Sequence, residues 1–178
     1  MSLLGAVVGV LQGEGIAHAL IGAAAMAVHG VSRATADVDL LTVDRAVLHS
    51  KVWQGLKTAG VEIRILKGDP EDPLAGNVRL SRSGDRTVDV VVGRHDWQRV
   101  IVDAATPVQV GGLEVRVVSP AGLILLKLDA GGPKDSWDAH ALLESLDQPV
   151  AVIAEVNRVV AKLPPASRRL WERILQDR

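Results

Sequence analysis

The pattern of apolar segments, broken by glycine and proline, predicts a mixed fold of strands and helices. Residues 2–12 have the spacing of an amphipathic helix. Residues 16–21 form an apolar strand that ends at Gly22, and a short helix is expected over 23–29. After a polar loop, residues 37–41 predict a buried strand that carries two aspartates.

The middle of the chain alternates between strand and turn signals. Asp44 is typical of a helix N-cap, and a helix is expected from there to residue 59, with Gly60 as its end. A further helix is expected over 95–105. Strands are expected at 61–66, 77–82, 86–92, 106–110 and 113–118, with hairpin turns at 83–85 and 111–112.

From Ser119 onward the pattern is helical. Ser119 followed by Pro120 is typical of a helix start, and glycines at 131 and 132 would end that helix. Further helices are expected at 135–146, 150–163 and 166–176. We therefore predict a core over residues 1–118 and a helical C-terminal subdomain over 119–178, packed on that core.

Composition and charge narrow the function classes. The 178 residues are 48% apolar and 23% charged, as in a globular domain with a sizeable core. The net charge of −1 argues against bulk attraction to nucleic acid, although not against a local patch. The absence of cysteine excludes disulfides, thiolate zinc sites and cysteine nucleophiles. No positive charge precedes Arg33 and no apolar run spans a bilayer, so we expect a cytoplasmic protein without membrane association.

The residues that can carry chemistry gather around Asp37 and Asp39. Side chains on a strand alternate between faces, so these two carboxylates point the same way. Carboxylates held this close repel each other unless cations neutralise them, and hard divalent ions such as Mg²⁺ prefer carboxylate oxygens. Asp89 lies in a second apolar strand. The alternative for each residue is a solvent-exposed carboxylate at a strand edge.

These residues, in this order, resemble the nucleotidyltransferase superfamily of the DNA polymerase β type. The three matching motifs are Ile21-Gly22-Ala23, Asp37-Val38-Asp39 and the single residue Asp89. The resemblance implies an α/β (α+β) fold, in which a nucleotidyltransferase-type mixed sheet is flanked by helices. One position departs from the pattern, because Ala23 stands where the family has Gly or Ser, and a hydroxyl donor for phosphate is missing.

The closer resemblance is to small bacterial members, including the AbiEii-type toxins of toxin–antitoxin systems. Their Arg-x-Thr/Ser-x-Asp-hydrophobic-Asp stretch is matched by residues 33–39. Their later helical motif is matched by Lys127 and, beyond the glycines, by Asp135 and Asp138. The resemblance covers roughly residues 15–145.

The resemblance implies a metal-dependent transfer of a nucleoside monophosphate from an NTP to an acceptor hydroxyl. Asp37, Asp39 and Asp89 would be catalytic and would hold two Mg²⁺ or Mn²⁺ ions, of which the one shared with Asp89 activates the acceptor. The nucleotide would be bound by Gly22, Ala23, Arg33, Thr35 and Lys127. Asp135 and Asp138 match the helical acids of the family, and their alternative role is to favour the dipole of their helix.

Three functions remain open at the level of sequence. The first is a toxin that modifies RNA or protein and has an antitoxin partner. The second is a small-molecule transferase of the antibiotic-modifying kind. The third is a non-catalytic nucleotide-binding module, which Ala23 favours.

Overall fold

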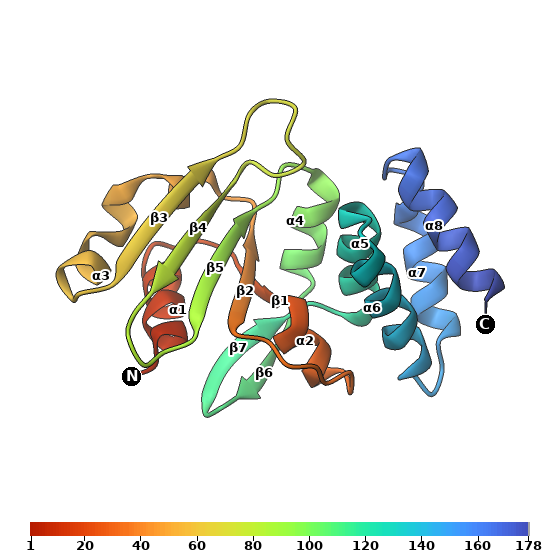
Figure 1. Ribbon diagram of the computed structural model, residues 1–178, viewed down its shortest axis with the longest axis horizontal. Helices are drawn as coiled ribbons and strands as arrows, with labels where there is room; N and C mark the ends of the chain where they lie inside the picture. The colour runs from red at the N-terminus through yellow and green to blue at the C-terminus, as the bar shows by residue number, and fades with distance from the viewer. Residues whose placement is uncertain (178) are drawn as a thin grey trace. The chain divides into compact units, whose positions relative to one another are not determined.

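The computed structural model describes residues 1–177, which form two compact units (Figure 1). The first unit comprises Met1–Ala24 and Ala34–Val118. The second comprises Ala25–Arg33 and the chain from Ser119 onward. The β-strands of the described residues lie in the first unit, and the second unit is helical.

A mixed sheet of seven strands organises the first unit, as far as the described chain shows. The strand order is β3-β4-β5-β2-β1-β7-β6. β2 pairs in parallel with β5 and β1 with β7, whereas the other neighbours are antiparallel. The predicted mixed sheet with flanking helices is thereby confirmed. The strands are β1 (Ala19–Ile21), β2 (Asp37–Thr42), β3 (Glu62–Lys67), β4 (Gly76–Ser81), β5 (Thr87–Val92), β6 (Thr106–Val110) and β7 (Leu113–Val117).

The alternation of side chains gives the sheet an apolar face and a polar face. On β5, Val88, Val90 and Val92 are fully buried, whereas Asp89 lies between them on the opposite face. The apolar side chains form the core of the unit. Helix α1 (Leu3–Gly13) contacts β5, and helix α4 (Asp96–Asp103) contacts β2.

The segment after β2 differs from the single helix predicted over 44–59. Asp44 does act as a cap, because its Oδ1 accepts the backbone N–H of Ala46 at 2.8 Å. However, the backbone is extended at His49, so the segment forms short helical turns instead of one continuous helix. These are the 3₁₀ turns η1 (Arg45–Leu48) and η2 (Ser50–Trp53), and then the helix α3 (Gln54–Thr58).

Tertiary packing explains the break in this helix. Trp53 is fully buried, and its indole N–H donates to the carbonyl oxygen of Val47 at 2.7 Å. A carbonyl used in this way is withdrawn from the i→i−4 ladder of a continuous helix. Burial of a large aromatic residue outweighs the modest helix propensity of the segment.

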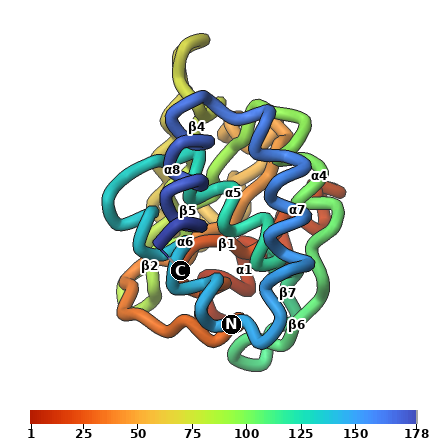
Figure 2. The backbone as a smooth tube through the Cα atoms, turned by 90° about the vertical axis from the view of Figure 1, so that its right-hand side faces the viewer, coloured from red at the N-terminus to blue at the C-terminus, as the bar shows by residue number. Residues whose placement is uncertain are grey.

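The second unit is built around helix α5, which contacts α6, α7 and α8; Figure 2 shows these helices in the blue-green to blue part of the chain. As predicted, Ser119 caps α5, with its Oγ accepting the N–H of Gly122 at 3.2 Å. Trp171 is buried, and its indole N–H donates to Asn157 at 2.7 Å. The helices are α5 (Pro120–Ala130), α6 (Pro133–Glu144), α7 (Val150–Val160) and α8 (Pro165–Gln176), and α2 (Gly22–Val28) begins in the first unit and ends in the second.

Within residues 1–177, the helices are all too short or too polar to cross a membrane.

Candidate active site

Three predicted carboxylates lie on the polar face of the sheet. β2 and β5 run in parallel with Asp39 directly opposite Asp89, and Asp37 is two residues before Asp39 on the same face. Asp37 and Asp39 are half-buried, and Asp89 is 8% exposed. The register therefore brings together the two strands that the sequence singled out separately.

The neighbouring strand β4 adds two residues that the sequence analysis missed. Arg79 lies opposite Asp89, and its Nη2 is 3.0 Å from Oδ2 of Asp37 and 3.7 Å from Oδ2 of Asp89. Asn77 donates from Nδ2 to Oδ1 of Asp89 at 3.0 Å. The sequence does contain the information that places Arg79 at the site, because counting outward from the hairpin turn at Gly84 puts Arg79 opposite Asp89.

Gly22 lies directly against the carboxylate of Asp39. It is the first residue of α2 and has φ of +65°, a backbone conformation that residues with a side chain rarely adopt. A Cβ built on Gly22 would also overlap Oδ2 of Asp39. Glycine is therefore required at this position for two reasons: the positive φ and the lack of space for a Cβ. The next residue, Ala23, is 2% exposed, so its methyl group lies in the core.

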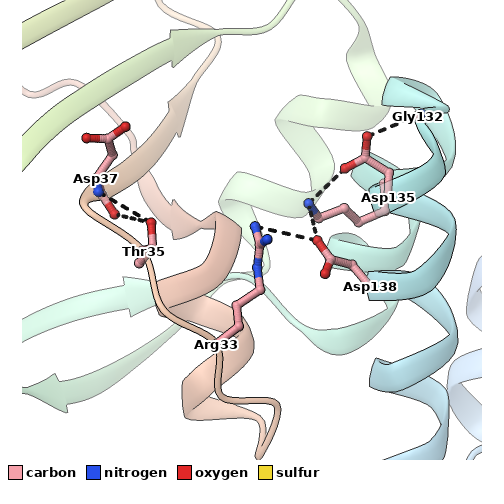
Figure 3. Close-up of polar contacts among 7 residues, drawn as sticks. Arg33, Thr35, Asp37, Gly132, Asp135 and Asp138 are labelled. Atoms are coloured by element: carbon pink, nitrogen blue, oxygen red, sulfur yellow. Dashed lines mark hydrogen bonds and ion pairs between the residues drawn. The ribbon is translucent and has the colours of Figure 1, made fainter.

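Thr35 orders the start of the acidic strand. Its hydroxyl donates to the carbonyl oxygen of Asp37 at 3.0 Å and accepts the backbone N–H of Asp37 at 3.3 Å (Figure 3). The contact is with the backbone, so it fixes the point at which β2 begins.

The chemistry of these donors fits a divalent cation. Within residues 1–177, no three carboxylate or imidazole groups are already gathered into a metal-ligand set. However, Asp37 and Asp89 share one cation in the form of Arg79, which shows that this face accommodates positive charge between them. Carboxylate oxygens are the ligands that Mg²⁺ and Mn²⁺ prefer.

A second group of predicted residues gathers within the helical unit. Nζ of Lys127 lies 2.9 Å from Oδ1 of Asp135 and 2.7 Å from Oδ2 of Asp138. Arg33 approaches the same Asp138 oxygen at 3.6 Å (Figure 3). The carboxylate of Asp138 is completely buried. Two cations therefore flank one buried anion, which offsets the cost of burying it.

Lys127 is held in its charged form by these partners. Burial lowers its pKa, but the hydrogen bonds to Asp138 and Asp135 outweigh burial and raise the pKa above the ordinary value. Asp135 also accepts the N–H of Gly132 at 3.2 Å with its other oxygen, which fixes the start of α6. The position of Lys127 is thus determined by α6.

No protein-family model matches the sequence, and no curated protein is detectably similar to it. The solution structure of the antibiotic-resistance factor ANT(2″)-Ia aligns with a TM-score of 0.54 over 88% of each chain at 12% identity. The lincomycin-bound lincosamide antibiotic adenylyltransferase LnuA aligns with a TM-score of 0.51, over 80% of this chain and 96% of that chain, at 14% identity.

This chain has the nucleotidyltransferase fold.

A third structure, an antigenic nucleotidyltransferase-like protein from Paracoccidioides brasiliensis, covers 94% of this chain and 90% of its own at 19% identity. Its TM-score of 0.49 is too low to add weight. At these identities the likeness concerns the nucleotidyltransferase fold alone, because one fold hosts many activities. The closer resemblance to AbiEii-type toxins stays a prediction.

Proposed function

We propose that this protein is a metal-dependent nucleotidyltransferase, which moves a nucleoside monophosphate from an NTP to an acceptor hydroxyl. The observation that carries the proposal is the shared face of Asp37, Asp39 and Asp89 on two paired strands. The fit of Gly22 against Asp39 supports it, because it couples the start of α2 to the acidic strand.

The residues of this face have distinct roles in the proposal. Asp37, Asp39 and Asp89 would hold divalent cations, which would neutralise charge on the phosphates and activate the acceptor hydroxyl. Asp89 serves the acceptor side, and Asn77 keeps its carboxylate oriented through one oxygen. The acceptor hydroxyl loses its proton to solvent, and its oxygen bonds to the α-phosphorus. The bond between the α-phosphorus and the oxygen that bridges it to the β-phosphate breaks, and pyrophosphate leaves.

The nucleotide side of the proposal rests on the sequence motifs. Gly22 and Ala23 offer backbone N–H groups at the start of α2, and Arg33 and Lys127 offer positive charge. Asp135 and Asp138 act here as positioning residues, because they hold the Lys127 ammonium group in place. Thr35 contributes by ordering β2 and not by a direct contact.

The test is a transfer assay with four α-labelled nucleoside triphosphates, Mg²⁺ or Mn²⁺, and two sets of acceptors. Total RNA represents the toxin-like alternative, and a panel of hydroxyl-bearing antibiotics represents the small-molecule alternative. We expect label to pass to one set. Asp89→Asn should abolish transfer while sparing most triphosphate binding.

Asp103→Asn is the matched control, because Asp103 is an exposed carboxylate at the end of α4 and lies outside the strands of the sheet. It should transfer label like the unmodified protein. Tight triphosphate binding without transfer to any acceptor would instead favour the non-catalytic module.

The small-molecule alternative has one specific support. Two similar structures with TM-scores above 0.5 are an antibiotic-resistance factor and a lincosamide antibiotic adenylyltransferase. The RNA-directed alternative, with an antitoxin partner, rests on the motif of residues 33–39 and on Lys127. Label in the small-molecule panel alone would decide against a toxin role.

A further inference from the structure

Arg79 occupies the position at which a divalent cation would meet two of the three carboxylates. A single nitrogen, Nη2, contacts Oδ2 of both Asp37 and Asp89. We propose that Arg79 is a built-in competitor of the metal: it holds Asp37 and Asp89 in the metal-free protein and must leave when a divalent ion binds. The inference rests on the proposed function and adds a residue that controls metal loading.

The register of the sheet fixes this arrangement. Arg79 lies directly opposite Asp89 in the β4–β5 hairpin, so its side chain rises from the same face as the carboxylates. Asn77, two residues earlier, binds the other oxygen of Asp89. Each Asp89 oxygen therefore has its own partner on β4: Asn77 contacts Oδ1, and Arg79 approaches Oδ2.

The exposure of the contact makes the displacement feasible. The side chains of Arg79 and Asp37 are 49% and 38% exposed. Ion pairs this exposed are weak, and salt weakens them further. The guanidinium group can therefore move into solvent when a stronger cation arrives.

The charge of Arg79 nevertheless lowers the affinity of these carboxylates for metal. A unit cation about 5 Å from a divalent ion repels it enough, at the dielectric constant of water, to change its affinity roughly tenfold. A triphosphate brings further oxygens and negative charge to the ion. Metal should consequently load efficiently only together with the nucleotide.

The experiment measures Mn²⁺ binding without nucleotide or acceptor, by electron paramagnetic resonance of the free ion at low ionic strength. Arg79→Gln removes the charge and keeps a polar side chain, and we expect it to bind Mn²⁺ about tenfold tighter than the unmodified protein. Arg79→Lys keeps the charge and should bind within about twofold of the unmodified protein, which also controls for folding.

Arg64 provides a matched control on the same face. It lies opposite Arg79 on β3, and its own ion pair is with Glu62 at 2.9 Å. Arg64→Gln removes an equal charge one strand farther from the carboxylates and should leave Mn²⁺ affinity nearly unchanged.

Unchanged or weaker Mn²⁺ binding by Arg79→Gln would overturn the proposal, as would an equal gain in Arg64→Gln or no Mn²⁺ binding by any variant. This readout is independent of transfer. A protein that transfers no label but gains Mn²⁺ affinity on Arg79→Gln would lose the proposed function and keep this inference.

Discussion

At the scale of single residues, the position of Gly22 shows why one motif could be recognised from sequence. The motif needs a glycine because the turn from β1 into α2 has positive φ and because Asp39 fills the space of a side chain. Arg79 belongs to no recognised motif. Its importance follows from the pairing of β4 with β5, because the register of that hairpin places it opposite Asp89.

Gly22→Ala should destabilise the protein by about 3 kcal/mol, since backbone strain of about 1–2 kcal/mol adds to the displacement of Asp39. Urea unfolding followed by circular dichroism gives the free energy. Gly84→Ala is the matched control, because Gly84 also has positive φ (+82°) but open space around a Cβ. Gly84→Ala should lower the free energy of unfolding only by the cost of the backbone strain. Equal losses in both variants would show that Asp39 does not need the space at Gly22.

At the scale of elements, strand boundaries and caps were largely predictable, whereas one helix was not. The hairpin at Ser83–Gly84–Asp85 and the cap at Ser119 depend on local chemistry that the sequence states directly. The segment 44–59 depends on where Trp53 is buried, which is a property of the assembled core. The placement of residues 25–33 with the helical unit is likewise a matter of tertiary contacts.

A second prediction concerns the buried carboxylate of Asp138, where α5 contacts α6. Asp138→Asn should destabilise the protein by about 3 kcal/mol, because it leaves Lys127 and Arg33 without their shared counter-charge. Asp135→Asn is the comparison: Asp135 is 23% exposed and should cost about 1 kcal/mol or less. Both are measured by urea unfolding. Similar losses in the two variants would mean that burial of Asp138 does not set its contribution.

At the scale of the whole molecule, the pH dependence of stability should carry a signature of His18. This side chain is 7% exposed, and its Nδ1 contacts the carbonyl oxygen of Ile16 at 2.8 Å. Burial lowers the pKa of His18 below the ordinary 6.5, the hydrogen bond to Ile16 raises it in part, and the charge of Arg116 lowers it again. The folded protein therefore resists protonation more than the unfolded chain does.

Stability should consequently fall as pH drops below about 6.5 and stop falling, for this group, below the lower pKa of the folded state. His18→Gln should flatten this part of the curve, measured as the free energy of urea unfolding between pH 5 and pH 8. His49→Gln serves as the control, because His49 is exposed. A slope that survives His18→Gln unchanged would assign the effect to another group.

The four tryptophans have an optical consequence. The protein has no tyrosine or phenylalanine, and the tryptophans divide evenly, with Trp53 and Trp97 in the first unit and Trp137 and Trp171 in the second. Replacing the first pair by phenylalanine would leave intrinsic fluorescence that comes from the helical unit alone. Because Trp171 is buried and Trp137 is 63% exposed, a red shift in that emission would report the opening of the α8 core. Each unit can thus be observed separately without an added dye.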